Sequence, residues 1–395
     1  MKKKTVRDID VKGKKVLVRV DFNVPLDVNT KKISDDSRIR AALPTLKYLI
    51  DQGSKVILCS HLGRPKGKVV EDMRMAPVAK RLSEILGRHV KSTTDCIGPE
   101  IEAEVAELKD SDVILLENLR FYTDEEKNDP GFAKSLARLG EIYVNDAFGT
   151  AHRAHASTAG VADYLPAVAG FLMEKEIDYL GGALANPERP FAMIIGGAKV
   201  ADKIALLENI IRKIDVLVIG GGMANTFLKA QGHDVGSSKV EDDQLEFTSE
   251  LIEKASAKNV KVLLPVDVEA AEEFTAQANH KTVSIDDVPK GWMVLDIGPK
   301  TIKMFSDEIK RCKTIVWNGP MGVFEFPSFA VGTKAIASLV ASVNATTIVG
   351  GGDTAAAVEA AGVDSMITHI STGGGASLEF LEGKELPGIA VLQDK

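Results

Sequence analysis

Short apolar runs alternate with amphipathic segments along the whole length of this chain, and that alternation restricts its fold more than any other feature. Runs of Val, Ile and Leu typical of buried strands occupy residues 15–20, 55–60, 112–117, 141–146, 191–196, 216–220, 261–266, 314–319, 346–350 and 367–371. Helical patterns lie between them, such as 76–87, where Pro77 suits a first turn and Gly87 a C-terminal cap. Because parallel strands need helical crossovers, we expect an α/β fold with doubly wound parallel sheets covered by helices on both faces.

The length of the chain, 395 residues, exceeds what one ordinary core supports and predicts about two domains. A helical pattern runs from about Phe171 to Leu184 and is closed by Asn186-Pro187, with no strand-like run inside it. It is the best candidate for an interdomain helix. Strand ends before it carry Asp, Asn, His and Arg, whereas strand ends after it carry glycine. Ligands of parallel sheets bind at the carboxyl ends of strands, so the two halves should bind different ligands.

Charge and composition exclude several kinds of partner. A net charge of −7 argues against nucleic acid or an anionic membrane, so we expect neither, and any anion must be bound by local basic groups. Cys59, Cys96 and Cys312 are widely spaced, which predicts reduced thiols without a disulfide framework or a zinc site. The start of the chain lacks the apolar stretch of a signal peptide, and no run approaches the ~20 apolar residues of a membrane helix, so we expect a cytoplasmic protein.

Consecutive glycines follow four of the strand-like runs in the second half, namely Gly196-Gly197, Gly220 to Gly222, Gly350 to Gly352 and Gly373 to Gly375. Glycines at a helix N-terminus expose backbone N–H groups that favour phosphate. Four such loops at one sheet edge indicate a site for several phosphates. The first cluster is expected to open a helix that carries Lys199 and Lys203 on one face, where their charges would repel unless an anion lies there.

Basic side chains follow the strands of the first half. His61 and Arg64 follow one strand, Arg120 follows another, Arg153 follows a third, and Arg38 stands before the next helix. Arginine presents a planar fork that binds carboxylate and phosphate in a bidentate manner. Several arginines at one sheet edge therefore predict a small substrate with more than one negative charge.

Three further basic residues have other interpretations. His152 and His155 form an HxxH pair, which is also a metal-ligand spacing, but no third ligand is evident and we favour anion binding. Arg19 lies inside a strand and is expected to be structural.

The GGGDT segment at 350–354 offers two interpretations. No stretch matches the GxxxxGK[ST] loop, so a Walker-type nucleotide site is excluded. Gly350, Gly352 and Ala355 do match the relaxed dinucleotide pattern of an NAD(P) dehydrogenase, but the residues about 20 positions on include no Asp or Glu for a ribose. Asp353 could cap a helix, or it could bind Mg²⁺ on nucleotide phosphates, and the two roles can coexist.

Six segments together resemble the phosphoglycerate kinase family: KVLVRVDFNVP, SHLGRP, GGAKVADK, VWNGPMGVFEF, GGGDTA and STGGGASLE. The resemblance runs essentially end to end with the motifs in the expected order. It implies two Rossmann-like domains joined by a hinge helix, with a C-terminal tail that returns to the first domain. The implied parts are 1–170 for the substrate domain, 171–186 for the helix, 187–372 for the nucleotide domain and 373–395 for the returning segment.

The same resemblance implies an enzyme and its site. The reaction is reversible phosphoryl transfer between 1,3-bisphosphoglycerate and Mg-ADP, giving 3-phosphoglycerate and Mg-ATP, in glycolysis or gluconeogenesis. The implied substrate-binding residues are Asp21, Phe22, Asn23, Arg38, His61, Leu62, Gly63, Arg64, Arg120 and Arg153. The implied nucleotide-binding residues are Lys203, Asn318, Glu325, Gly351, Gly352, Asp353 and Thr354, with Glu325 at the ribose and Asp353 at Mg²⁺. The implied catalytic residues are Arg38, Lys199, Gly352 and Gly375.

Two positions depart from the family pattern. Val294 stands where many relatives have glycine beside the adenosine, and Asn225 stands where many have an aromatic residue. The resemblance also implies a monomer whose domains close by hinge bending around the middle helix and residues 371–375. A non-catalytic member of the same fold remains an alternative, which the intact charged and glycine positions disfavour.

Overall fold

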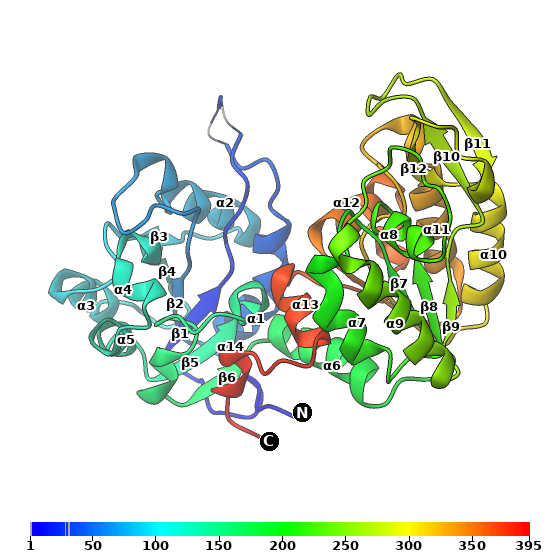
Figure 1. Ribbon diagram of the computed structural model, residues 1–395. Helices are drawn as coiled ribbons and strands as arrows, with labels where there is room; N and C mark the ends of the chain where they lie inside the picture. The colour runs from blue at the N-terminus through cyan, green and yellow to red at the C-terminus, as the bar shows by residue number, and fades with distance from the viewer. Residues whose placement is uncertain (1, 28, 31) are drawn as a thin grey trace. The chain divides into compact units, whose positions relative to one another are not determined.

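The computed structural model describes residues 2–27, 29–30 and 32–395. The chain divides into two compact units (Figure 1). Unit 1 contains Met1–Asp178 and Glu385–Lys395, and unit 2 contains Tyr179–Lys384. Helix α6 (Phe171–Ala185) carries the chain from the first unit into the second, which confirms the uninterrupted helix that the sequence predicts there.

Unit 1 is built on a parallel sheet of six strands in the order β3-β4-β2-β1-β5-β6. Its strands are β1 (Lys15–Val20), β2 (Lys55–Cys59), β3 (Lys91–Ser92), β4 (Val113–Leu115), β5 (Ile142–Asp146) and β6 (Ala167–Ala169). Its helices are α1 (Ser37–Asp51), α2 (Ala76–Leu86), α3 (Pro99–Ala106), α4 (Thr123–Glu126), α5 (Pro130–Ala137) and α14 (Pro387–Ala390). The central strand β1 is buried from Val16 to Val20 and packs with α1 and α2 into one apolar core.

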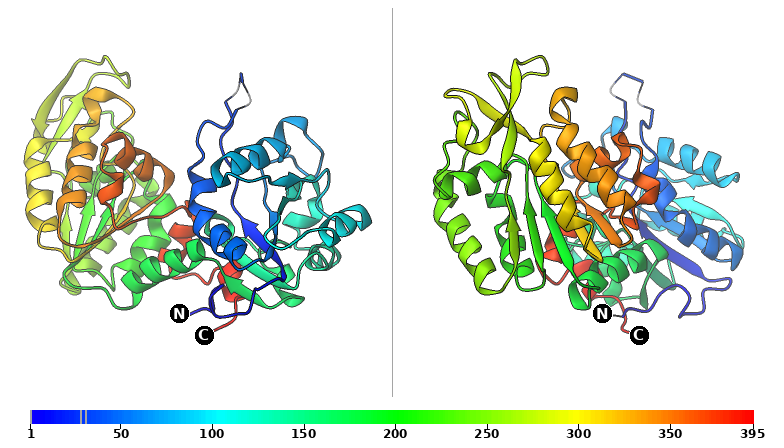
Figure 2. Two further views of the ribbon diagram at one scale, coloured as in Figure 1. Left: turned by 180° about the vertical axis from the view of Figure 1, so that it is seen from behind. Right: turned by 90° about the vertical axis from the view of Figure 1, so that its right-hand side faces the viewer.

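Unit 2 has a second parallel sheet of six strands, in the order β15-β14-β13-β7-β8-β9. Its strands are β7 (Phe191–Ile195), β8 (Val216–Ile219), β9 (Lys261–Leu263), β13 (Thr314–Asn318), β14 (Thr346–Gly350) and β15 (His369–Ile370). Its helices are α7 (Ile204–Ile210), α8 (Met223–Ala230), α9 (Leu245–Ala257), α10 (Pro299–Ile309), α11 (Val331–Ser342), α12 (Gly352–Ala360) and α13 (Gly375–Leu381). Helix α8 packs on α9, and α11 packs on α10 and α12, so helices form a layer on each face of the strands (Figure 2).

Both sheets confirm the doubly wound parallel fold expected from the strand and helix alternation. The cap expected after α2 is also present, because Gly87 adopts a left-handed conformation with φ 65° and ends that helix. Pro77 lies in its first turn, where a missing N–H costs no helical hydrogen bond.

Unit 2 also contains a small antiparallel sheet that the sequence reasoning did not predict. Its strands β10 (Asp267–Ala271), β11 (His280–Ser284) and β12 (Met293–Ile297) occur in the order β11-β10-β12. Strand β11 is largely exposed, so it lacks the apolar run by which a buried strand is recognised. This sheet forms one wall of a cavity described below.

Candidate active site

The basic residues of unit 1 gather where four neighbouring strands end. Strands β4, β2, β1 and β5 are adjacent and parallel, so their carboxyl ends meet at one edge of the sheet. Asp21 follows β1, His61 follows β2, Arg120 follows β4, and Arg153 lies in the loop after β5. We call Arg38, His61, Arg120 and Arg153 the basic cluster. Burial lowers the pKa of His61 most, and the charges of all three arginines lower it further, as expected for side chains that share one site.

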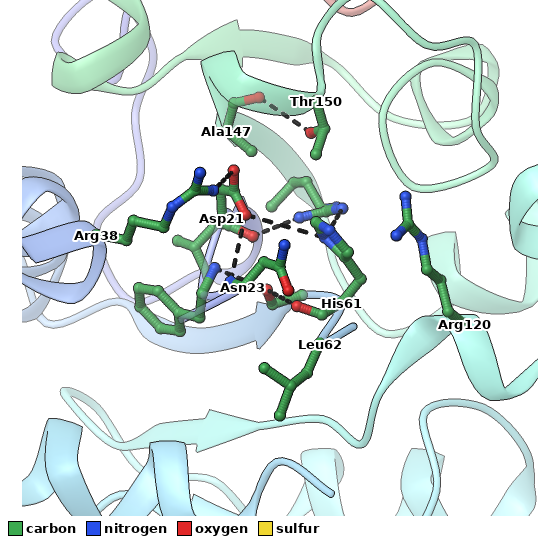
Figure 3. Close-up of polar contacts among 12 residues, drawn as sticks. Asp21, Asn23, Arg38, His61, Leu62, Arg120, Ala147 and Thr150 are labelled. Carbon is green, nitrogen blue, oxygen red and sulfur yellow. Dashed lines mark hydrogen bonds and ion pairs between the residues drawn. The ribbon is translucent and has the colours of Figure 1, made fainter. Parts of the chain in front are cut away.

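Asp21 and Asn23 hold this edge together through contacts visible in Figure 3. Arg38 forms an ion pair with Asp21 through Nη1 and Oδ2. Asn23 accepts a hydrogen bond from the backbone N–H of Gly63 through Oδ1, at 2.8 Å. The loop after β1 is thereby fastened to the loop after β2, and Arg38 on α1 is turned toward both.

His61 is neutral and is held in one tautomer. It is 4 % exposed, and burial together with the charges of Arg19 and Arg120 lowers its pKa well below the usual range. Arg19 donates from Nη2 to His61 Nδ1 at 3.2 Å, and because a guanidinium can only donate, Nδ1 must be the acceptor. The ring proton therefore resides on Nε2, so His61 can offer a hydrogen bond to an anion.

Arg19 is fully buried, as expected for a structural residue inside a strand. Its Nε donates to Ser157 Oγ at 2.8 Å, and Ser157 in turn donates to the buried carboxylate of Glu125 at 2.5 Å. The sequence reasoning missed Glu125 as a counter-charge beneath the basic cluster. In the sequence Glu125 looks like an ordinary acidic residue of a helix, so only the fold reveals that it is buried beside Arg19.

Arg120 carries hydrogen-bonding capacity that the protein leaves unused. The side chain is 3 % exposed, Nη1 donates to the carbonyl of Gly63 at 3.0 Å, and Nε lies 3.3 Å from Glu126 Oε1. Its buried Nη2 has no hydrogen-bond partner among the described residues. A buried donor without a partner costs about 1–3 kcal/mol, and an anionic ligand would satisfy it.

Other residues implied at this site have different surroundings. The side chains of Phe22 and Leu62 belong to the apolar core, so only their backbone could contact a ligand. Arg64 is exposed on the turn after Gly63, and Arg153 donates from Nε to His152 Nε2 at 3.1 Å. Asn118, which the sequence reasoning missed, accepts from the N–H groups of Leu62 and Arg120 and thereby positions both loops.

The glycine clusters of unit 2 line one edge of its sheet. Strands β15, β14, β13, β7 and β8 are neighbours, and each ends beside a glycine-containing loop. A cavity of about 540 Å³ opens at this edge. The polar residues that line it are Lys199, Asp202, Lys203, Asn318, Asp353 and Thr354. Glycines of three clusters, including Gly197, Gly351, Gly352, Gly374 and Gly375, complete its walls.

The helix expected to carry Lys199 and Lys203 on one face does not form as predicted. Residues 196–200 are a loop, a single 3-10 turn covers Ala201–Lys203, and helix α7 begins only at Ile204. The prediction was wrong because Gly197 turns the chain with φ 96°, and the N–H of Val200 is bound by the Glu241 carboxylate instead of a helical partner. Both lysines nevertheless line the same cavity.

Lys203 and Asn318 are joined at the floor of this cavity. The ammonium of Lys203 donates to Asn318 Oδ1, and Asn318 Nδ2 donates to the carbonyl of Gly350 at 2.7 Å. Burial lowers the pKa of Lys203, while the charges of Asp202, Glu382 and Asp353 raise it. Thr354 Oγ accepts from the N–H of Gly319 at 2.6 Å, which fixes the loop after β13 to the start of α12.

A second cavity, of about 350 Å³, adjoins the first and has mostly apolar walls. The two share Gly197, Ala198, Pro320 and Asp353. The apolar cavity lies between α8 and the small antiparallel sheet, and Gly221, Gly222, Asn225, Val294 and Glu325 line it. Lys239 and Phe274 also line it, and the sequence reasoning missed both because each is a single exposed residue without a motif.

Asp353 fits the chemistry of a magnesium ligand. It is exposed in the first turn of α12 and lines both cavities, so its side chain faces open space beside the glycine loop. The N-cap of that helix is Gly351, and Asp353 is therefore not the N-cap. In the described part of the chain, no group of three or more His, Cys, Asp or Glu side chains could hold a metal ion. Such an ion would therefore depend on Asp353 and on phosphate oxygens.

Comparisons with known proteins agree with this geometry. The family model described as phosphoglycerate kinase matches residues 6–384. The chain belongs to the phosphoglycerate kinase family. A curated phosphoglycerate kinase from Moorella thermoacetica is 60% identical over 395 residues, with 100% of both chains covered. Another, from Pelotomaculum thermopropionicum, is 58% identical with the same coverage.

Solved phosphoglycerate kinase structures share the fold. The structure from Coxiella burnetii has a TM-score of 0.90 at 43% identity, and that from Pyrococcus horikoshii has 0.84 at 34%. Each comparison covers 98% of both chains. The chain is therefore a kinase of glycolysis that transfers a phosphoryl group between 1,3-bisphosphoglycerate and ADP, as the sequence motifs predicted. The alternative of an NAD(P) dehydrogenase is excluded.

Two further expectations concern features outside the site. All three cysteines are buried and free, as expected for reduced thiols. None of the helices in the described part of the chain combines the length and apolarity that a membrane crossing requires.

Proposed function

We propose that unit 1 binds 3-phosphoglycerate or 1,3-bisphosphoglycerate through its basic cluster, and that unit 2 binds Mg-ADP or Mg-ATP at its glycine edge. The observation that carries the first assignment is the buried Arg120, whose Nη2 has no hydrogen-bond partner within the described residues. The charges of Arg120, Arg38 and Arg153 all act on His61, so the four side chains belong to one cluster. Three arginines and a neutral histidine donor match a small ligand with a carboxylate at one end and a phosphate at the other.

The nucleotide assignment rests on the two adjoining cavities. The glycine-lined cavity, with Lys199 and Lys203 on its walls, suits a polyphosphate, and the apolar cavity suits a nucleoside. Asp353 lies where the two meet and would hold Mg²⁺ on the phosphates. Glu325, exposed at the rim of the apolar cavity, would bind the ribose.

The chemistry needs no general base. The acceptor in the direction of ATP consumption is a carboxylate, which is already ionised at pH 7. Catalysis then depends on in-line placement and on neutralising charge around a loose transition state. Arg38 would act from unit 1, and Lys199 with the N–H groups of Gly352 and Gly375 would act from unit 2. Mg²⁺, when bound, screens the phosphate charge.

Transfer further requires that groups on two units meet. We propose a closing motion about α6 and residues 371–375, which would also exclude water and limit ATP hydrolysis. Small-angle X-ray scattering with both substrates should give a smaller radius of gyration than either substrate alone. An unchanged radius with both bound would contradict closure. We further propose a cytoplasmic monomer, and light scattering at several protein concentrations would test the monomer.

A coupled assay with 3-phosphoglycerate and Mg-ATP tests these residue roles. Replacing Lys199 or Arg38 by alanine should cost about 3–4 kcal/mol of transition-state stabilisation, or about 10²–10³ in turnover. Arg40→Ala is a matched control on α1, because Arg40 is exposed and pairs with Asp36 outside the basic cluster. Full activity in Lys199→Ala or Arg38→Ala would contradict the role proposed for that residue. No turnover in the parent would contradict the proposed reaction as a whole.

A further inference from the structure

The loop that carries Lys199 is fixed at both of its ends. At its start, the N–H of Gly197 donates to the carbonyl of Pro320 at 3.0 Å. At its end, the side chain of Val200 is fully buried, and the N–H of this residue donates to the carboxylate of Glu241. Lys199 lies exposed between these two points and lines the glycine-lined cavity, so its place in that cavity depends on both of them.

Glu241 supplies an acceptor that the loop itself lacks. The backbone from Gly197 to Val200 is not helical, so the Val200 N–H has no carbonyl one turn earlier to bind. A buried N–H without an acceptor is unfavourable, and the Glu241 carboxylate therefore determines where the backbone of Val200 lies. Glu241 is itself held in place from α8, because its own N–H donates to Oγ1 of the buried Thr226 at 3.2 Å.

The position of Glu241 outside the site restricts how it can act. Glu241 is not among the described residues that line either cavity of unit 2, whereas Lys199 lines the glycine-lined one. Lys203 also bonds to the loop, through its N–H and the carbonyl of Val200 at 2.8 Å, but its ammonium is held separately by Asn318. The hydrogen bond from Val200 to Glu241 should therefore act mainly on the adjacent Lys199.

We infer that Glu241 is a positioning residue for phosphoryl transfer, which holds Lys199 at the transferring phosphoryl group by fixing the backbone of Val200. This inference rests on the proposed role of Lys199. A loose transition state is stabilised by charges that are already in place, and a displacement of about 1 Å can lower the rate by as much as about 10²-fold. A displaced lysine can still reach a phosphate of the bound nucleotide, so turnover should suffer more than binding.

The coupled assay with 3-phosphoglycerate and Mg-ATP tests this inference in the full-length chain. Glu241→Ala should lower kcat by about 10–10²-fold with little change in KM for Mg-ATP. Glu241→Gln should recover most of the lost kcat, because its amide oxygen can accept from the Val200 N–H. Thr226→Val, which frees the backbone of Glu241, is a second variant and should lower kcat by less. Asp243→Ala is the matched control, since it removes an exposed acidic side chain two positions further on and should retain the parent's kcat.

A double-mutant cycle shows whether Glu241 acts through Lys199. If it does, Glu241→Ala should lower kcat much less in a Lys199→Ala background than in the parent. An equal fold-loss in both backgrounds would overturn the inference, as would a Gln variant as slow as the Ala variant, or parental kcat in both Glu241→Ala and Thr226→Val. None of these outcomes affects the role of Lys199. Parental kcat in Lys199→Ala would overturn that role and the inference with it. A thermal unfolding scan of each variant confirms that the folded protein is being assayed.

Discussion

Glycine lines the nucleotide edge for two different physical reasons. At Gly196 and Gly319 an added Cβ would overlap the backbone of the neighbouring loop, so these positions allow the loops after β7 and β13 to pack closely. At Gly352 an added Cβ would meet nothing within 4 Å and would point into open space. The first kind of glycine serves the fold, whereas the second kind leaves room for a ligand.

Gly352→Ala should therefore fold normally and lose activity. Its backbone is already in an ordinary helical conformation, so the free energy of unfolding should change by less than about 1 kcal/mol. Turnover in the coupled assay should fall by about 10²–10³, since the methyl group would displace a phosphate from the N–H groups. Gly182→Ala in α6 is the control, because its Cβ also meets nothing and it lies outside both cavities. Parental activity in Gly352→Ala would contradict the proposed phosphate contact.

The residue types of the basic cluster were predictable, but their electrostatic states were not. The motifs place Arg38, His61 and Arg120 at strand ends, and the sheet order brings them together. The low pKa of His61 depends on burial and on the charge of Arg19, both of which arise only when β1 and β2 pair. The burial of a single side chain cannot be read from the sequence, so the direction of each pKa shift had to come from the structure.

At the scale of elements, the apolar strands and the capped helix α2 were predicted correctly. The start of the helix that follows the first glycine cluster was not. The helix expected from Gly196 onward begins only at Ile204, because a glycine turn and the Glu241 carboxylate capture the intervening backbone. The antiparallel sheet β10–β12 was missed because its outer strand is exposed and follows no apolar pattern. In both places tertiary contacts overrode the local pattern.

Asp146 connects strand β5 to the start of α6 and should make stability depend on pH. Its Oδ1 accepts from the N–H groups of Leu172 and Met173, at 2.9 and 3.2 Å. Burial raises its pKa from 3.8 to about 7. The folded state thus keeps a proton that the unfolded state loses, so this group's contribution to stability falls as pH rises from about 4 to about 7 and stays low above that.

The Asp146→Asn side chain is neutral at every pH, so this variant should not lose stability through position 146 as pH rises. Its melting temperature relative to the parent should therefore rise between pH 4 and pH 7, by the equivalent of up to about 4 kcal/mol. His155 acts with the opposite sign, because burial lowers its pKa to about 4, but it is present in both proteins and cancels. Thermal unfolding across this range checks the prediction, and parallel curves for the two proteins would contradict it.

At the scale of the whole molecule, the last residues of the chain complete unit 1. Glu385–Lys395 belongs to that unit, and Leu386, Ile389 and Leu392 are each at most 2 % exposed. Asn145 on β5 donates from Nδ2 to the carbonyl of Gly388 at 2.9 Å, so the segment is bound at the sheet. The stability of unit 1 thus depends on residues that lie more than two hundred positions after β5 in the sequence.

Deleting residues 385–395 should destabilise unit 1 strongly. The deletion removes the burial of three aliphatic side chains against unit 1, which contributes about 1.5–3 kcal/mol each, and the segment's hydrogen bonds to unit 1 are lost as well. The melting temperature should fall by more than about 5 °C in a calorimetric scan. Asp394→Ala is the control, because it removes only the ion pair of an exposed side chain with Lys3, and its melting temperature should stay close to that of the parent. A truncated chain that melts with the parent would show that the segment is dispensable.

The sequence alone determined the fold class, the family and the chemical types of the site residues. It did so because buried strands, helix caps and family motifs are local patterns, which a short stretch of sequence contains in full. The expected domain limits and individual residue roles stay predictions. Tertiary structure decided which glycines serve packing and which leave space, where the helix after Gly196 begins, and how His61 is protonated. Each of these depends on contacts between residues that are far apart in the sequence, and a local sequence pattern does not contain such contacts.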